Sequence, residues 1–218
     1  MFTSSRRIIE HEILDEQTPE AGKRSLHDLV RINRYLGGHG ATRKALRTVA
    51  PKGPFTVLDV GAASGDTADV IRSQYPLAQV TSLDAKIHHM RVAQSPKVVG
   101  DAFSLPFRGK SYDIVHCSLF LHHFTDDQVK HLLAGFREIA RVAVVVNDLE
   151  RHALAYYFLP ATKWLLQWDP ITIHDGPISV QAAFKAAELK ILAEQAGLRD
   201  VQTRVYRPAF RITLVAGP

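Results

Sequence analysis

Residues 57–66 read VLDVGAASGD, an apolar run that leads into two closely spaced glycines. The apolar and β-branched side chains are typical of a buried strand. Gly61 and Gly65 allow a positive φ and let a ligand approach the backbone closely. A helix that begins after such a turn directs its free N–H groups at the ligand. The stretch therefore predicts a strand, a ligand-binding turn and a helix.

Strands and helices alternate around this turn. We expect strands at 55–60, 79–84, 97–99, 112–118 and 142–147, and helices from the turn to about 73 and over 126–140. Apolar strands separated by helices indicate a parallel sheet covered on both faces. After a helix over 184–197, strands at 201–206 and 210–215 are joined by only three residues, so this pair must be antiparallel. The predicted fold class is α/β: a doubly wound, Rossmann-like seven-stranded sheet, mostly parallel, with a C-terminal antiparallel hairpin.

The rest of the chain divides into two further segments. Residues 1–50 predict two short helices broken by a glycine pair at 37–38, and we expect them to form a helical N-terminal cap on a domain of residues 51–218. Residues 148–180 are too long for a plain connection and are rich in tyrosine and tryptophan. We expect this insertion to build a substrate pocket, although its tyrosines are equally expected on an ordinary helix packed on the core.

Composition and charge exclude several classes of protein. The chain has 218 residues and a net charge of +5, with the basic excess spread over its flanks rather than gathered in one stripe. This distribution is typical of a solvated surface, so no nucleic-acid partner is expected. No apolar stretch is long enough to span a membrane, no secretory core follows the N-terminus, and the single cysteine, Cys117, excludes an internal disulfide. We expect a cytoplasmic monomer or homodimer.

The glycine spacing distinguishes between two classes of ligand. A dinucleotide fingerprint would require glycines at 63 and 66, where the chain has Ala63 and Asp66. The pattern D-x-G-x-A-x-G, from Asp59 to Gly65, instead resembles motif I of the class I S-adenosylmethionine-dependent methyltransferases, with alanine at the middle glycine. The resemblance implies S-adenosylmethionine as the methyl donor and a methyltransferase domain over residues 51–218.

Three later features occur in the order that this family shows. An acidic residue closes the second strand, another follows the third, and residues 112–124 resemble the fourth-strand motif. The resemblance implies that the turn and the fourth-strand end hold the methionine moiety, and that the two acidic residues hold the ribose and the adenine. Arg34 is a candidate partner for the methionine carboxylate, with a solvated helix face as the alternative. The implied cofactor-binding residues are Arg34, Asp59, Gly61, Ala62, Gly65, Asp84, Ala85, Asp101, Ala102 and Ser118.

The sequences LPF at 105–107 and LHHF at 121–124 resemble small-molecule enzymes related to ubiquinone/menaquinone-biosynthesis and natural-product methyltransferases. The proline-containing tetrad of amino-methylases is absent, since the corresponding stretch is SLFL at 118–121. We therefore expect methylation at oxygen or carbon of a small aromatic or quinone/polyketide-like acceptor. A catalytically idle S-adenosylmethionine-binding module and an RNA methyltransferase are the alternatives.

A phenol or enol acceptor needs a base, and histidine titrates close to neutral pH. His122, after the donor-binding strand, and His174, in a glycine- and proline-flanked loop, are the candidate catalytic residues, each with a structural role as the equal alternative. His123 and Tyr157 are candidate substrate-binding residues. We expect no metal site, because the histidine pairs at 88–89 and 122–123 lack i, i+4 spacing and partner carboxylates in the sequence.

Overall fold

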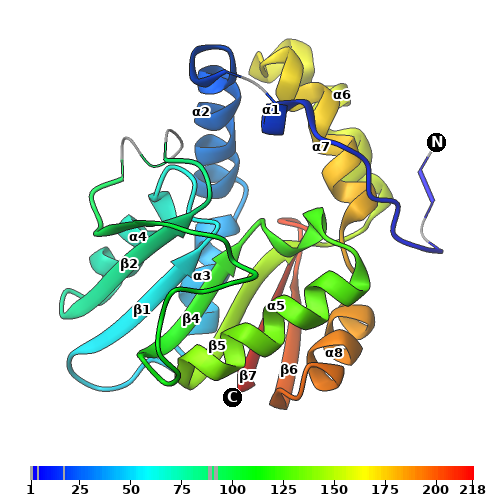
Figure 1. The fold of residues 1–218 in the computed structure, drawn as a ribbon. Coiled ribbons are helices and arrows are strands. Elements are labelled where there is room, and N and C mark those ends of the chain that lie inside the picture. The colour runs from blue at the N-terminus through cyan, green and yellow to red at the C-terminus, as the bar shows by residue number, and fades with distance from the viewer. Residues whose placement is uncertain (1, 4, 17, 88–89, 91–92) are drawn as a thin grey trace.

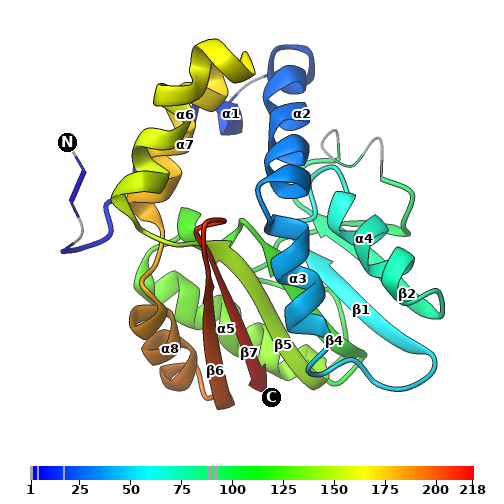
Figure 2. The same cartoon turned by 180° about the vertical axis from the view of Figure 1, so that it is seen from behind.

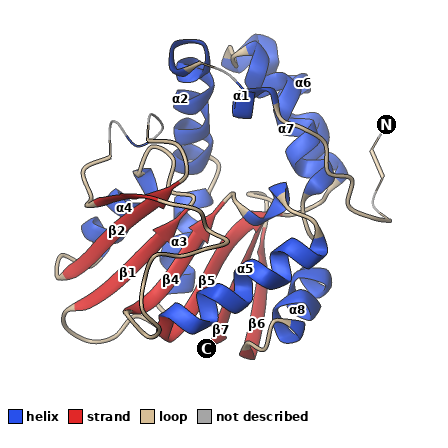
Figure 3. Cartoon of the chain, viewed as in Figure 1, coloured by secondary structure: helices blue, strands red, loops and turns tan. Residues whose placement is uncertain are grey.

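The computed structural model describes residues 2–3, 5–16, 18–87, 90 and 93–218. Within this part of the chain, seven strands form one sheet in the order β3-β2-β1-β4-β5-β7-β6 (Figure 3). Strand β7 runs antiparallel to β5 and to β6, and the other pairs are parallel. The predicted fold class is therefore confirmed. The strands are β1 Phe55–Val60, β2 Ala78–Asp84, β3 Lys97–Val99, β4 Tyr112–Ser118, β5 Ala140–Leu149, β6 Arg199–Tyr206 and β7 Arg211–Gly217.

Helices cover both faces of the sheet (Figures 1 and 2). Helices α5 (Asp126–Ile139) and α8 (Ala186–Gln195) lie on one face, and α3 (Gly38–Leu46) and α4 (Asp66–Gln74) lie on the other. Strand β1 shows why two cores form, because Leu58 packs with the α5 and α8 side while Val57 packs with the α3 and α4 side. This alternation follows from the two-residue period of a strand.

The remaining helices stand above the carboxyl edge of the sheet (Figure 1). They are α1 (Ile13–Glu16), α2 (Pro19–Tyr35), α6 (Ala153–Leu166) and α7 (Pro170–Ala182). The helices of the first fifty residues thus divide between two places: α2 lies over the edge, whereas α3 packs on the sheet beside β5 and β7. None of the described helices is both long and apolar enough to cross a membrane.

Helix α7 corrects the expectation of a loop around His174. Pro170 occupies the first turn of the helix, where its missing N–H costs nothing, and the Asp169 side chain accepts a hydrogen bond from the Ile171 N–H at 3.0 Å. Pro177 is accommodated inside the helix. Pro170 therefore starts a helix, and the prediction of a loop from the flanking prolines was wrong at this position.

Candidate active site

The turn after β1 has the backbone shape that its glycines predict. Gly61 and Gly65 have φ of 67° and 75°, and Ala63 has φ of 43°. A Cβ at Gly61 would overlap the ring of Phe120, so both the backbone conformation and the close contact require glycine. The N–H groups of Gly61 and Ala62 donate to the Leu83 carbonyl, which fixes the turn against the end of β2.

Asp84, at the end of β2, supports the same turn. One carboxylate oxygen accepts the Ala63 N–H at 3.0 Å, and the other accepts the Lys86 N–H at 2.8 Å. A carboxylate has about four acceptor positions, so both oxygens keep capacity for a ligand. Asp84 can therefore hold the turn and bind hydroxyl groups at the same time.

Asp59 is buried beneath the turn. Its Oδ1 lies 2.8 Å from His116 Nδ1, whereas Oδ2 has no hydrogen-bond partner in the described part of the chain. Burial raises the pKa of the Asp59 carboxyl, and His116 only partly offsets it. A buried carboxylate oxygen without a partner suits a cationic ligand group, which would satisfy it. The ammonium of a bound methionine moiety fits this requirement.

A small cavity of about 80 Å³, here named the turn cavity, lies between the turn and α2. Four of the predicted cofactor residues, Asp59, Gly61, Ala62 and Ser118, line it together. Leu26, Leu29, Val30, Asn33, Ala63, Ser64, Asp66, Thr67 and Leu119 complete its lining.

The other predicted cofactor residues lie outside this lining. Gly65 begins α4, and Ala102 is half-buried after β3. Asp101 and Ala85 are exposed. Arg34 is also exposed, with its guanidinium carbon 5.4 Å from the Tyr35 ring centroid, and the neighbouring Asn33 faces the turn instead. The histidine pair at 88–89 lies outside the described residues.

A second, larger cavity of about 530 Å³, here named the cap cavity, lies between α2 and the α6–α7 pair. Leu29 and Leu119 line both cavities, so the two adjoin. Apolar side chains of α2, α6 and the β6–β7 turn make most of the wall. The polar or charged side chains in its lining are Glu12, Ser25, Tyr35, His122, His123, Thr172, Asp175, Ser179 and Arg211.

His122 is buried at the cavity wall between two carboxylates. Its Nδ1 lies 2.6 Å from Asp148 Oδ1, and its Nε2 lies 3.7 Å from Glu12 Oε1. Burial lowers the pKa of His122, but the charge and hydrogen bond of Asp148, followed by those of Glu12, outweigh it and raise the pKa to about 9. Burial raises the pKa of Glu12, but the hydrogen bond of His122 and the charge of His123 bring it down to about 2. The group is an imidazolium held between two ionised carboxylates.

Glu12, His122 and His123 also meet the first condition for a metal site, since one ligand atom of each lies within 4.8 Å of the others. The pair at 122–123 has a carboxylate neighbour that its own stretch of sequence does not show, because the fold brings Glu12 to it. A proton on His122 offsets one of the two negative charges of Glu12 and Asp148, and Glu12 also accepts the Ser179 hydroxyl. We interpret the group as an acid–base cluster.

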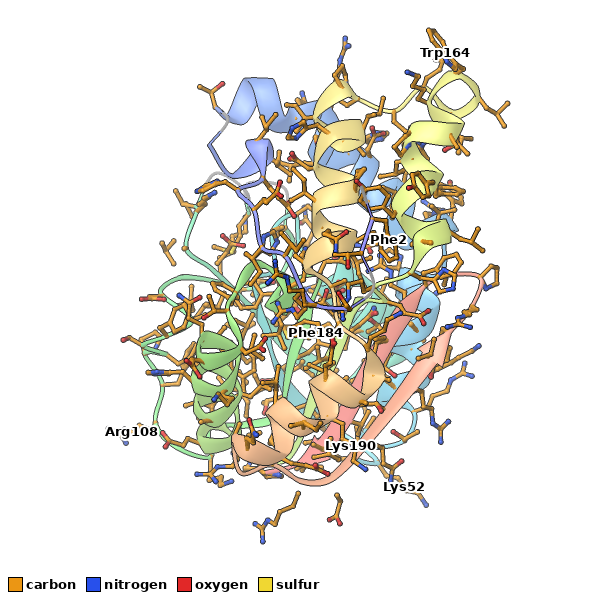
Figure 4. The ribbon with its side chains drawn as sticks, turned by 90° about the vertical axis from the view of Figure 1, so that its right-hand side faces the viewer. Phe2, Lys52, Arg108, Trp164, Phe184 and Lys190 are labelled. Atoms are coloured by element: carbon orange, nitrogen blue, oxygen red, sulfur yellow. The ribbon has the colours of Figure 1, made fainter. Side chains whose placement is uncertain are left out.

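The structure separates the two predicted catalytic histidines. His122 and the predicted substrate residue His123 line the cap cavity, whereas the side chain of His174 is 51 % exposed and outside the lining. Tyr157 is 52 % exposed and also outside it. On the same helix, Trp164 points away from the sheet at the outer end (Figure 4).

Glu12, Asp148 and Arg211 were missed by reasoning from the sequence. Asp148 had a signal, because it directly follows the strand predicted at 142–147, at the edge of the sheet where ligands bind. Glu12 and Arg211 lie far from every motif along the chain.

Comparisons with known proteins show the family of the chain. A family described as a methyltransferase domain matches residues 58–144. A demethylmenaquinone methyltransferase of Roseiflexus sp. (strain RS-1) is 31% identical over 188 residues, which cover 76% of each chain. The chain belongs to the class I S-adenosylmethionine-dependent methyltransferases. It is thus an enzyme that uses S-adenosylmethionine as its methyl donor.

Other proteins similar to this methyltransferase support the assignment. A demethylmenaquinone methyltransferase of Porphyromonas gingivalis is 26% identical over 189 residues, covering 74% of this chain and 75% of the relative. Human N-acetylserotonin methyltransferase, solved in complex with SAM, superposes with a TM-score of 0.65 at 18% identity, covering 91% of this chain and 57% of the human chain. The latter similarity shows the fold alone.

Proposed function

We propose that this methyltransferase transfers a methyl group to an oxygen or carbon atom of a small, planar, largely apolar acceptor bound in the cap cavity. The observation that carries the proposal is the apolar cap cavity, which adjoins the turn cavity and is lined by the buried His122, whose partner is Asp148. The names of the relatives support a small acceptor, since they include demethylmenaquinone and malonyl-[acyl-carrier protein] methyltransferases. An aromatic or quinone-like ring fits the lining best.

The donor site in this proposal is the turn and its neighbours. Asp59 and the backbone of the turn bind the amino end of the methionine moiety, and the free Oδ2 of Asp59 supports that assignment. Asp84 binds the ribose hydroxyls through its remaining acceptor positions. Asp101, exposed after β3, is assigned to the adenine.

The cap in this proposal consists of α1, α2, α6 and α7, with residues 148–180 as the substrate-pocket insertion. Helix α3 belongs to the sheet layer. Closing the cap over the acceptor excludes water, which would otherwise surround the reacting atoms. Aligning the two reactants supplies most of the remaining rate enhancement.

His122 is the general base that accepts the acceptor's proton. S-Adenosylmethionine supplies an activated methyl group whose bond to sulfur breaks as the bond to the acceptor forms. The Nε2 atom of neutral His122 accepts the proton that the acceptor loses, while Asp148 holds the Nδ1–H and stabilises the resulting imidazolium. Because the pKa of His122 is about 9, the neutral form grows as pH rises, and turnover should rise with it.

The test has two steps. Calorimetric titration should show binding of S-adenosylmethionine and S-adenosylhomocysteine and none of NAD. Release of S-adenosylhomocysteine is then measured with naphthohydroquinones, substituted phenols and total tRNA as acceptors. Turnover on a hydroquinone or phenol supports the proposal, whereas turnover on tRNA alone would refute it.

A further inference from the structure

Two arginines are fully buried among the described residues, and they differ in what balances their charge. Arg151 forms a two-point contact with the Glu188 carboxylate, at 3.0 Å and 2.5 Å, and also donates to the Ala183 carbonyl. Arg211 donates one hydrogen bond of 2.9 Å from Nη2 to the neutral amide oxygen of Asn33. Among the described residues, its Nη1 has no hydrogen-bond partner and no carboxylate lies within ion-pair distance of it.

Arg211 is placed by the sheet at the wall of the cap cavity. It begins β7, opposite Leu149 of β5 and Tyr206 of β6, and it lines the cap cavity but not the turn cavity. The turn between α2 and α3 leaves room for it. A Cβ at Gly38 would lie 2.6 Å from Asn33 Oδ1 and 3.2 Å from Arg211 Nη2, so a side chain there would disturb the Asn33–Arg211 pair.

Burying a cation without a carboxylate partner costs free energy, and a partner of opposite charge lowers that cost. Burial lowers the pKa of Arg211 to about 10, with Asp148 and Asp66 opposing it from a distance, so the side chain remains a cation at neutral pH. Arg211 belongs to the cavity lining, and its buried Nη1 lacks a hydrogen-bond partner among the described residues, so the planar guanidinium has an unused donor that suits an oxygen anion.

We propose that Arg211 binds an anionic oxygen of the acceptor, a carboxylate or an ionised enol, so that the preferred acceptors are small apolar acids. This inference rests on the proposed role of the cap cavity as the acceptor site. In this cavity, Arg211 binds the charged end of the acceptor, and His122 accepts the proton lost in the reaction. The two groups come from elements far apart in the chain.

The experiment compares two probes of nearly the same shape, 1-hydroxy-2-naphthoate and its uncharged methyl ester, by calorimetry with S-adenosylhomocysteine present. The wild-type protein should bind the acid more tightly than the ester. Arg211→Met should weaken binding of the acid by roughly ten- to a hundredfold and leave binding of the ester nearly unchanged, because only the charged hydrogen bonds are lost. His122→Gln should keep the preference for the acid. Phe158→Leu, a change in the apolar wall, should weaken both probes alike.

A second variant covers the case in which Arg211→Met does not fold, as judged by circular dichroism. Asn33→Asp retains Arg211 and gives it a carboxylate at the position of the present 2.9 Å hydrogen bond. This internal anion should abolish the preference for the acid. A preference that persists in a folded Arg211→Met or Asn33→Asp protein overturns the proposal, as does a wild-type protein that does not distinguish acid from ester.

The same variants also test whether Arg211 binds the carboxylate at the methionine end of the donor instead of an anion of the acceptor. If Arg211→Met weakens S-adenosylhomocysteine but not 5′-methylthioadenosine, which lacks the amino-acid end, Arg211 serves the donor and the proposal is refuted. Failure of the wild-type protein to turn over any hydroquinone or phenol would refute the proposed function. The comparison of acid with ester measures the role of Arg211 separately.

Discussion

The turn cavity and the cap cavity meet at Leu29 and Leu119 but are built in different ways. The turn cavity is about 80 Å³ and lies between α2 and one continuous turn, whose positive φ angles leave little freedom of sequence. The cap cavity is about 530 Å³ and is lined by side chains from α2, α6, α7 and the β6–β7 turn. Side chains that line a cavity can change, and with them the ligand, without a change of fold, whereas a turn that depends on positive φ angles tolerates fewer substitutions.

Loss of the His122 imidazole should have the largest effect and should be confined to the cap cavity. We expect His122→Gln to lower kcat by about 10²- to 10⁴-fold, the usual contribution of a general base, with an unchanged Kd for S-adenosylmethionine. His174→Gln is the matched control, because its half-exposed side chain lies outside the cavity lining. Steady-state kinetics and calorimetry on both variants measure this, and equal turnover in the two would remove His122 from the reaction.

A change at Asp84, which supports the donor turn in our proposal, should act on donor binding only. Asp84→Asn removes the charge of a carboxylate assigned to the ribose, and we expect S-adenosylmethionine to bind about ten- to a hundredfold more weakly, a loss of ~1–3 kcal/mol. Asp113→Asn is the control, since this aspartate pairs with Arg141 at the opposite end of the sheet. Wild-type affinity in Asp84→Asn would contradict the assignment.

Glu12 should set the pH dependence of the reaction in the cap cavity. In the wild-type protein, kcat should rise with pH toward a midpoint near 9, because the neutral form of His122 accepts the proton and its pKa is about 9. Glu12→Gln removes a negative neighbour that favours the imidazolium, so the midpoint should move to lower pH. The other charged groups around His122, namely Asp148, His123 and Arg7, remain in place. A pH profile with an unmoved midpoint would show that another group titrates.

Chelation should have the smallest effect. If Glu12, His122 and His123 act as an acid–base cluster, dialysis against EDTA should leave kcat unchanged within a factor of about two. Restoration of lost activity by Zn²⁺ alone would show that the three residues hold a metal instead.

Most of the fold followed from local pattern. Strands β1, β3 and β4 have the predicted bounds, and β5 extends the predicted strand at both ends because it pairs with β4 and β7. Helix α7 was not predicted, because a proline in its first turn and another within it resemble loop signals. Packing against α1, α2 and α6 decides that segment.

The candidate site was predictable only where it is contiguous. The turn at 57–66 and the acidic residue at the end of β2 belong to motifs whose spacing is visible along the chain. Arg34 illustrates the limit, because one residue along a helix rotates the side chain by about 100°, and Asn33 rather than Arg34 faces the turn.

The α/β class, the antiparallel C-terminal hairpin and the glycine turn at 57–66 can be deduced from the sequence, because strand period, loop length and glycine conformation are local properties of the chain. Which charged groups meet at the cap cavity depends on the tertiary structure. Glu12, His122 and Asp148 are joined there, and Arg211 is buried without a carboxylate partner among the described residues. The physical reason is that burial and charge pairing depend on distances across the fold, and no spacing along the chain encodes those distances.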